Sequence, residues 1–462
     1  MPWYLCVFHQ KWAEFRCTEV EAVADAFGVP TGGDGGVAWR PPAGGNEASP
    51  FWHVRLPGDA VARQVAERSM CIKVLLELWG DGASRGECEA AFASSRVLVA
   101  PVAAPGSSFR FAVDGFGQKV DWSGNAERFE WLATALGLQG KVQLDGPEHT
   151  VWHIEATATS NELAACVVDR LYVGREVGRG VYRGKLLEEL DLKKRAYIGP
   201  TSMAAEESLI MCNCASVRRG SLVLDPFAGT GSILVAAARF GAQCLGGDID
   251  IRVLKHGKPD TRQKQRTALP WDNFEQYGLR APLGLLRMDA SRPPWRPGLE
   301  GLLDAVVCDP PYGVRAGGRK SGGRKRGEDG VLGYTIPEEM RADHIPSTAP
   351  YTLAECCADL LDTSARLLRL GGRLVYFLPS AHDTYTEADV PAHPSLRLVG
   401  NGEQRLTLRW SRRLVVMVKV APWDASGAAA AREANLARRD TLTEALAADG
   451  EAKAAKGERK GR

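Results

Sequence analysis

The amino-acid sequence predicts an α/β protein in which a mostly parallel sheet with an antiparallel C-terminal strand follows a separate α+β region. From about residue 200, short apolar runs alternate with tight turns and helical segments, as in a parallel sheet with crossover helices. Four of these runs end in an aspartate, which is typical of buried parallel strands that present polar groups at one edge of a sheet. The first 170 residues mix extended and helical runs without that repeat.

Composition places the chain among ordinary globular proteins. Its 462 residues are 45% hydrophobic and 25% charged, which is long and apolar enough for two or three domains. No apolar run approaches the roughly 20 residues of a membrane span, and the first residues lack the pattern of a secretory signal. We therefore expect a soluble, cytoplasmic protein.

The eleven cysteines and eight histidines do not suggest a metal site, because no pair of CxxC knuckles occurs. We expect free thiols in a reducing compartment and no structural zinc in this chain. The formal net charge of +2 is too small to indicate nucleic-acid binding by itself. A nucleic-acid function therefore has to rest on local basic clusters.

The first 170 residues are typical of a binding module, since they contain no catalytic constellation. Apolar residues at helical spacing predict one helix in 19–28 and a longer one through 59–80. A glycine- and proline-rich stretch at 31–50 predicts a loop. The expected strands are 3–8, 51–56, 109–116 and 150–156.

The second part is expected to contribute the parallel sheet. A helix over 351–370 should end at Gly371 and Gly372, before the next strand. Residues 421–462 are rich in Ala, Glu, Lys and Arg without an apolar stripe, so we expect a tail. The expected strands are 221–225, 242–250, 284–290, 304–309, 373–379, 396–401 and 412–420.

The motif DPFAGTG at 225–231 lies between the first of these strands and a helix. Glycines here let the backbone approach a ligand closely and leave the first amides of the helix free. A dinucleotide fold would require G-x-G-x-x-G/A, but Leu234 stands at the third glycine position and would crowd a pyrophosphate. Asp225 instead fits a ligand with an amino or cationic group, such as the amino-acid end of S-adenosylmethionine.

Two further acids end the next two strands. Asp248 follows Asp225 by about 20 residues and is placed to accept hydrogen bonds from ribose hydroxyls. Asp289 could accept a hydrogen bond from the amino group of adenine. Each acid alone is equally well explained as a cap or turn residue, whereas the series at successive strand ends favours a cofactor site.

The fourth strand ends in DPPY at 309–312. Asp309 can accept a proton of an exocyclic amine, and the carbonyl of Pro310 can accept another because proline breaks the strand ladder. Tyr312 offers a face on which a base can stack. DPPY alone could also be a proline turn with a capping aspartate. After DPFAGTG in the same sheet, we interpret it as a site of methyl transfer to an amino group, by positioning and without a metal.

Taken together, these motifs are similar to those of class I methyltransferases that act on amino groups of nucleobases. KKRAYIGPTSMAAEESLIMCNCASV, GDIDIRVLKHGK, WDNFEQYGL and DPPYGVRAG resemble the eukaryotic tRNA (guanine-10-N2) methyltransferase family. FRCTEVEAVADAFG and ERSMCIKVLLELWGDG are similar to the N-terminal region of that family, and GKVQLDGPEHTVWHIEA to its THUMP domain. The similarity spans roughly residues 1 to 420. Ala204 departs from the family, which usually has an acid at that position.

The resemblance implies a ferredoxin-like subdomain plus a THUMP tRNA-binding module in 1–170, a linker in 171–199, a Rossmann-like methyltransferase domain in 200–420 and a flexible tail in 421–462. It implies tRNA as substrate, N2-methylguanosine at position 10 as product and S-adenosylmethionine as donor. It also implies a small zinc-binding activator subunit as partner. The implied cofactor-binding residues are Asp225, Pro226, Gly229, Gly231, Asp248, Ile249, Asp289 and Ala290, and the implied catalytic residues are Asp309, Pro310, Pro311 and Tyr312.

Basic residues cluster directly after DPPY and at 193–195. Such clusters are more often solvated loops than binding sites. If the front module binds tRNA, however, Arg315 and Arg319 are well placed to hold backbone phosphates near the target base, so we favour binding for these two.

Two other functions stay open at this point. The DPPY chemistry is shared with DNA or rRNA amino-methyltransferases, although the THUMP-like front half argues against them. A noncatalytic RNA-binding protein with a decayed methyltransferase domain is the other alternative, and the intact DPFAGTG, Asp248 and DPPY argue against it.

Overall fold

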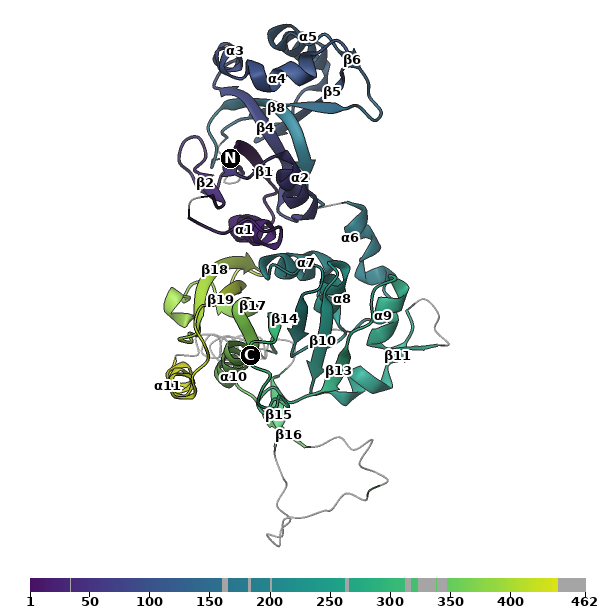
Figure 1. Ribbon diagram of the computed structural model, residues 1–462, viewed down its shortest axis with the longest axis vertical. Coiled ribbons are helices and arrows are strands. Elements are labelled where there is room, and N and C mark those ends of the chain that lie inside the picture. The colour runs from purple at the N-terminus through teal and green to yellow at the C-terminus, as the bar shows by residue number, and fades with distance from the viewer. Residues whose placement is uncertain are drawn as a thin grey trace, which may run out of the picture. The chain divides into compact units, whose positions relative to one another are not determined.

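The computed structural model of the protein describes residues 1–33, 35–159, 165–181, 184–199, 202–261, 266–311, 317–322, 338 and 347–438 (Figure 1). The chain divides into two compact units, Met1–Lys185 and Leu186–Arg462, which we name the N-terminal unit and the C-terminal unit. Each unit contains its own sheet and its own buried apolar clusters.

The described residues of the N-terminal unit form a sheet of eight strands: β1 (Trp3–Phe8), β2 (Ala38–Arg40), β3 (Phe51–Arg55), β4 (Ile72–Gly82), β5 (Ser108–Phe116), β6 (Lys141–Val142), β7 (His149–Ala156) and β8 (Arg170–Arg179). Their order in the sheet is β2-β3-β1-β4-β8-β7-β5-β6. Neighbours are antiparallel from β2 to β7, whereas β5 is parallel to β7 and β6. The strands expected at 3–8, 51–56, 109–116 and 150–156 are confirmed.

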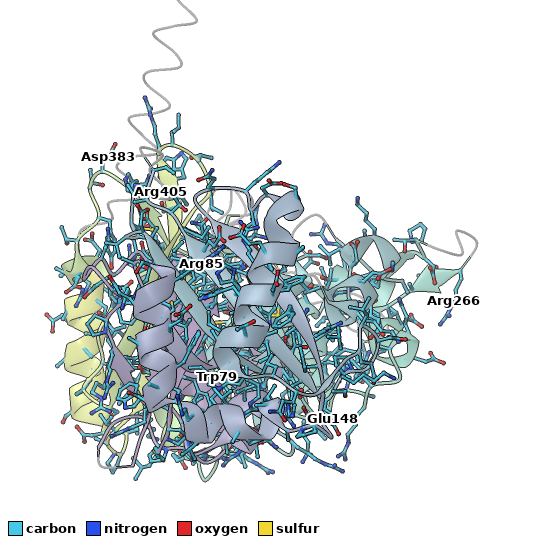
Figure 2. The ribbon with its side chains drawn as sticks, turned by 90° about the horizontal axis from the view of Figure 1, so that it is seen from above. Trp79, Arg85, Glu148, Arg266, Asp383 and Arg405 are labelled. Carbon is cyan, nitrogen blue, oxygen red and sulfur yellow. The ribbon has the colours of Figure 1, made fainter. Side chains whose placement is uncertain are left out.

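Helices and turns of this unit are α1 (Arg16–Ala26), α2 (Asp59–Arg68), α3 (Arg85–Ser94), α4 (Arg96–Ala103), α5 (Asn125–Leu136), η1 (Ala13–Phe15) and η2 (Trp122–Gly124). Trp79, labelled in Figure 2, is 1% exposed and belongs to an apolar cluster that α3, α4 and α5 form with the sheet. Alternation along β7 places Val151 in this cluster and Trp152 in a second one on the other face.

The long helix expected through 59–80 is wrong beyond Arg68, where α2 ends and the chain continues into β4. The cause is a buried acid from another element. Glu19 on α1 accepts hydrogen bonds from the amides of Met70 and Cys71 at 2.8 and 2.9 Å and from the hydroxyl of Ser69. These amides are thus satisfied outside a helix, and the following apolar run can pair as a strand.

The C-terminal unit contains a sheet whose described strands are β9 (Leu222–Asp225), β10 (Gln243–Asp248), β13 (Gly284–Arg287), β14 (Leu303–Cys308), β17 (Leu368–Ala381), β18 (Leu396–Arg405) and β19 (Trp410–Lys419). Their order is β13-β10-β9-β14-β17-β19-β18. Strands from β13 to β17 are parallel, and β19 is antiparallel to both β17 and β18. The expected mostly parallel sheet is therefore confirmed. The order reverses between β9 and β14, where open α/β sheets bind ligands at the carboxyl ends of their strands.

The remaining described elements of this unit are α6 (Lys185–Glu189), α7 (Ala205–Cys214), α8 (Ser232–Arg239), α9 (Pro270–Gln276), α10 (Leu353–Leu367), α11 (Ala425–Leu436), η3 (Leu192–Lys194), η4 (Arg252–His256), η6 (Glu387–Asp389) and two short ribbons, β11 (Lys258–Pro259) with β12 (Thr267–Ala268) and β15 (Arg319–Ser321) with β16 (Thr348–Pro350). Helix α10 starts with a capping box, in which the hydroxyl of Thr352 accepts from the amide of Glu355 at 3.2 Å. None of the helices in the described part of the chain is both long and apolar enough to span a membrane.

Two boundaries differ from the expected ones. The linker does not begin at residue 171, because β8 pairs with β4 and β7 inside the N-terminal sheet. The flexible tail does not begin at residue 421, because α11 follows and Asn435 on it bonds both backbone polar groups of Ala392. The end of the expected tail, from residue 439 on, lies outside the described residues.

Replacing Glu19 tests whether its carboxylate causes the change from helix α2 to strand β4. Glu19→Ala should lower the free energy of unfolding by roughly 2–4 kcal/mol, because it leaves buried amides at Met70 and Cys71 without their acceptor. Urea unfolding of the full chain measures this loss. Glu67→Ala, on the exposed side of α2, is the matched control. A loss as small as that of the control would contradict the explanation.

Candidate active site

The loop after β9 is built around a buried acid. Asp225 is 1% exposed, and one of its carboxylate oxygens accepts from the amide of Phe227 at 3.0 Å. Gly229 and Gly231 then adopt φ angles of 49° and 79°, in the left-handed region that side chains disfavour. Gly231 is the N-cap of α8, so the loop ends at a helix N-terminus, as the motif predicts.

Asp248, at the end of β10, ties this loop to the neighbouring strand. One oxygen accepts from the amide of Gly229 at 2.9 Å, and the other accepts from the amide of Asp250 at 2.8 Å. The amide of Ala228 also donates to the carbonyl of Gly247, at 2.8 Å. A carboxylate has about four lone-pair positions, so Asp248 keeps acceptor capacity for ribose hydroxyls.

Leu234, which stands at the third glycine position, packs into the sheet. It is fully buried on α8, and its Cδ1 lies 2.8 Å from where a Cβ of Gly246 would be. Helix α8 and β10 therefore approach closely through a leucine and a glycine, with the leucine on the helix.

Asp289, just after β13, is engaged on both oxygens. One accepts from the amide and hydroxyl of Ser291 at 2.9 and 2.7 Å, and the other accepts from the amide of Ser321 at 2.7 Å. Asp289 thus anchors the ribbon of β15 and β16 to the edge of the sheet. The remaining predicted cofactor residues Pro226, Ile249 and Ala290 directly follow Asp225, Asp248 and Asp289 at the same strand ends.

Asp309 directly follows β14, which lies between β9 and β17. Pro310 is buried and Pro311 is half-buried behind it. The structure therefore brings Asp225, Asp248 and Asp309 to one edge of the sheet, as the sequence predicts. Tyr312 and Arg315 lie outside the described residues.

Two charged residues at this edge were not predicted from the sequence. Arg412 on β19 lies with its Nη1 3.7 Å from Oδ2 of Asp309, and its Nη2 lies 3.0 Å from Oε1 of Glu207 on α7. The same guanidinium donates from Nε to Gln404 at 2.6 Å and lies 3.8 Å above the ring of Phe377. Arg412 is about a hundred residues after DPPY, so no local motif connects the two.

Carboxylates dominate the electrostatics of the strand ends. Burial raises the pKa of Asp225 well above its usual range, and the nearby carboxylates of Asp248 and Asp309 raise it further. Burial also raises the pKa of Asp248, although amides donate to it. Burial opposes ionisation of Asp289 too, but the hydrogen bonds from Ser291 and Ser321 outweigh it and lower the pKa of that carboxyl. A site of this kind favours a ligand with positive charge and amino or hydroxyl donors over a pyrophosphate.

The basic residues near the site differ in what they contact. Arg319, at the start of β15, is exposed and donates to the hydroxyl of Thr348 at 3.1 Å. Lys320 forms an ion pair with Glu355 at 2.5 Å. At the second cluster, Arg195 is 1% exposed and does not form part of a solvated basic surface.

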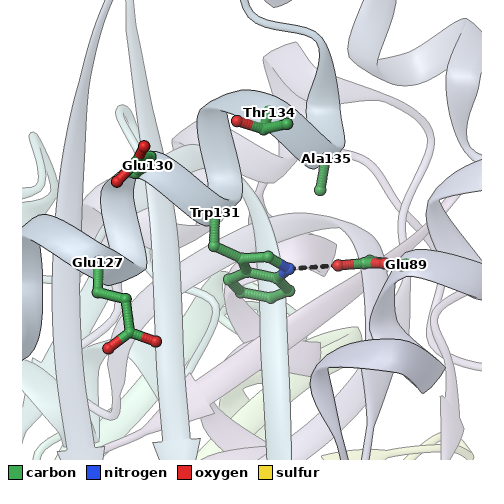
Figure 3. Close-up of a pocket in the computed structure, with 6 residues that line it drawn as sticks. All are labelled: Glu89, Glu127, Glu130, Trp131, Thr134 and Ala135. Atoms are coloured by element: carbon green, nitrogen blue, oxygen red, sulfur yellow. Dashed lines mark hydrogen bonds between the residues drawn. The ribbon is translucent and has the colours of Figure 1, made fainter.

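A pocket of about 440 Å³ lies in the N-terminal unit and is lined by Glu89, Glu127, Glu130, Trp131, Thr134 and Ala135 (Figure 3). The indole of Trp131 donates to Glu89 at 2.5 Å, and Glu127 pairs with Arg85. Its three glutamates would repel phosphates, and it contains no group from the strand ends described above. We therefore place the candidate active site in the C-terminal unit.

Both parts of the chain match models of known protein families. Residues 2–182 match the family model described as Tmrp11 THUMP N-terminal domain, and residues 193–324 match the RMKL-like methyltransferase domain. The crystal structure of TrmN from Thermus thermophilus is 18% identical and covers 90% of this chain and 99% of its own, but its TM-score of 0.40 is too low to support an argument.

Curated relatives match over nearly the whole chain. The tRNA (guanine(10)-N(2))-methyltransferase TRMT11 of Homo sapiens is 35% identical over 427 residues, which are 91% of this chain and 89% of the human protein. The protein of the same name from Dictyostelium discoideum is 33% identical over 449 residues, 92% of this chain and 84% of its own. By this similarity, the chain belongs to the tRNA (guanine(10)-N(2))-methyltransferase family.

Proposed function

We propose that the chain transfers a methyl group from S-adenosylmethionine to the exocyclic N2 of the guanosine at position 10 of tRNA, giving N2-methylguanosine. The main support is geometric: Asp225, Asp248 and Asp309 lie together at the carboxyl edge of one sheet. This chain is also 35% identical to a tRNA (guanine(10)-N(2))-methyltransferase over 91% of its length. The chain is accordingly an enzyme, and it acts in the cytoplasm.

The residues present fit S-adenosylmethionine. Asp225 and Asp248 supply buried carboxylates in a loop whose glycines leave room for a ligand, and the carboxylates complement its ammonium and ribose groups. Asp289, proposed as the acceptor for the adenine amino group, would have to share an oxygen that already accepts from Ser291 or Ser321. When bound, the cofactor supplies an electrophilic methyl group on a positively charged sulfur.

The chain's own contribution to the transfer is to orient the amine. Asp309 accepts a hydrogen bond from one N2–H of guanine and the carbonyl of Pro310 accepts from the other, which holds the nitrogen lone pair toward the methyl carbon. The lone pair of N2 would be the nucleophile, and Asp309 and Pro310 would orient it toward the methyl group that the bound cofactor supplies. The proton that N2 loses passes through Asp309 to water. Tyr312 stacks on the base.

Arg412 is a positively charged side chain next to Asp309. Its guanidinium lies between the carboxylates of Glu207 and Asp309, and its place above Phe377 restricts its motion. The positive charge of Arg412, 3.7 Å from Oδ2 of Asp309, is proposed to complement the carboxylate that accepts from the amine.

The N-terminal unit is proposed to bind the tRNA, in keeping with its match to a THUMP N-terminal domain model. Arg315 and Arg319 are proposed to hold phosphates near the target base. The exposed side chain of Arg319 and its position on the ribbon anchored by Asp289 support the second assignment.

A small zinc-binding activator subunit is the proposed partner, and we propose that it covers the β13 edge of the C-terminal sheet. Leu283 and Leu286 at this edge are 53% and 39% exposed. The opposite edge strand, β18, also exposes Leu398 and Val399, each 40%, but it has an irregularity between Leu398 and Gly400 and carries Arg397, which disfavours strand addition. β13 is therefore the edge better suited to pair with another chain.

Replacing the proposed acceptor tests the chemistry directly. Asp309→Asn should lower methyl transfer by about a hundredfold or more, because the amide keeps the shape of the side chain but loses its negative charge. Transfer of labelled methyl to unmodified tRNA, with nucleoside mass spectrometry and mapping of the product, gives the rate and position. Circular dichroism and tRNA binding should stay near those of the parent. Turnover near the parental rate, or methylation of DNA in preference to tRNA, would overturn the proposal.

Arg412→Ala should lower the rate of transfer by about tenfold to a hundredfold, because Asp309 loses the positive charge 3.7 Å from its carboxylate. The rate is measured at saturating cofactor and tRNA, so that weaker binding does not contribute. Arg397→Ala, an exposed arginine on the neighbouring strand β18, is the control and should leave the rate unchanged. Equal rates for the two variants would exclude a role for Arg412.

Leu286→Lys should weaken binding of the activator subunit by about tenfold, since it places a charge on the apolar edge. Leu408→Lys is the matched control, because Leu408 is 97% exposed at the turn between β18 and β19. Affinity is measured by calorimetry with the purified subunit. If only the control variant lost affinity, the partner would have to bind the opposite edge.

A further inference from the structure

The segment 194–199, KRAYIG, lies between η3 and α7 in the chain and is held by side chains of other elements; we call it the strap. Its residues fall in the linker expected at 171–199. In the structure Arg195, Ala196 and Tyr197 are each 1% exposed, so this part of the chain lies inside the C-terminal unit.

Helix α9 holds the strap with two amide side chains. Asn273 accepts from the amide of Tyr197 at 2.9 Å and donates to the carbonyl of the same residue at 3.0 Å. One turn later, Gln276 accepts from the amide of Ala196 and donates to the carbonyl of Lys194, both at 2.8 Å. An amide side chain has a donor and an acceptor, so each of these residues replaces a strand partner for the strap backbone.

The same elements contact the proposed cofactor loop. Asn273, which is fully buried, also donates from Nδ2 to the carbonyl of Thr230 at 3.4 Å. Nη1 of Arg195 donates to the hydroxyl of Ser232, the first residue of α8, at 2.7 Å. The hydroxyls of Ser202 and Thr230 lie 2.7 Å apart. Residues 230–232 are therefore held from behind by side chains of the strap, α9 and the segment after the strap.

The strap also contacts the chain that follows β10. The hydroxyl of Tyr197 donates to the carbonyl of Val253 at 2.9 Å, and the amide of Thr261 donates to the carbonyl of Ala196 at 3.1 Å. Val253 is five residues after Asp248, the proposed ribose acceptor. The strap thus connects the loop after β9 with the chain that leaves Asp248.

We propose that the strap is the support of the cofactor site, and that Asn273 and Arg195 are positioning residues that fix residues 230–232 for S-adenosylmethionine binding. The inference rests on the proposed function and adds residues that no sequence motif placed near the cofactor. Both side chains are buried, and they contact this stretch at the carbonyl of Thr230 and the hydroxyl of Ser232.

If Asn273 only stabilised the fold, its replacement would lower stability without a specific effect on cofactor binding, whereas a positioning residue would affect both. Asn435 on α11 offers the comparison within the same unit. It is 3% exposed and bonds the amide and the carbonyl of Ala392 at 3.1 and 2.9 Å, which is the pattern of Asn273 with Tyr197. Asn435 is on a helix that follows the last strand, and its partner Ala392 lies far along the chain from residues 225–231.

Asn273→Asp and Asn435→Asp are therefore compared in the full chain. Both keep the acceptor and replace the donor by an oxygen that faces a carbonyl, so both should lower the thermal midpoint. Asn273→Asp alone should raise the Kd for S-adenosylmethionine, measured by calorimetry, by about tenfold or more. Its Kd for unmodified tRNA should stay within about twofold of the parent, and kcat at saturating cofactor should be largely kept.

Ser232→Ala is the second variant if Asn273→Asp does not fold. It removes the acceptor of Arg195 with a small change in volume and should also raise the Kd for S-adenosylmethionine. Equal cofactor affinity in the parent and in the folded variants would overturn the inference, as would an equal loss in Asn435→Asp. A parent chain that binds no S-adenosylmethionine would instead contradict the proposed function.

Discussion

A carboxylate that is almost fully buried at the end of β9 is the constraint on which the C-terminal unit depends. Asp225 is 1% exposed, and an ionised group at such a depth is unfavourable without donors or positive charge near it. The amide of Phe227 supplies one donor, and Gly229 and Gly231, both with positive φ, then turn the chain into the start of α8. The next acid, Asp248, closes the loop by accepting from Gly229. The geometry of the loop and the raised pKa of Asp225 thus have the same origin, the burial of this carboxyl.

Asp309, at the end of β14, is subject to a different constraint. An acceptor for an exocyclic amine has to stay ionised beside other carboxylates, and Asp309 lies within electrostatic range of Asp225. The antiparallel strand β19 brings Arg412 to this point, and Glu207 on α7 holds the guanidinium from the other side. A strand beyond the parallel part of the sheet therefore places a charged side chain beside Asp309 as well as contributing to the core.

Sequence patterns failed where a polar side chain from a distant element intervened. The run 59–80 has helical spacing throughout, yet it changes from helix to strand at Ser69, where Glu19 takes the amides that a helix would have used. The segment 194–199 has the composition of a basic linker, yet Asn273 and Gln276 satisfy its backbone and allow its burial. In both cases the decisive partner is at least fifty residues away in the chain, so a local window contains no sign of it.

The sequence by itself determined the parallel sheet, the turn at DPFAGTG and the order of the acids at the strand ends, because apolar runs, glycines and strand-terminal aspartates are local signals. It also carried the resemblance to the tRNA methyltransferase family that the curated relatives confirm. Only the tertiary structure decided which groups surround those acids. Arg412 meets Asp309 because β17 and β19 pair antiparallel in one register, and Asn273 meets Thr230 because α9 packs behind the loop. Such contacts depend on the packing of whole elements, which no spacing along the chain records.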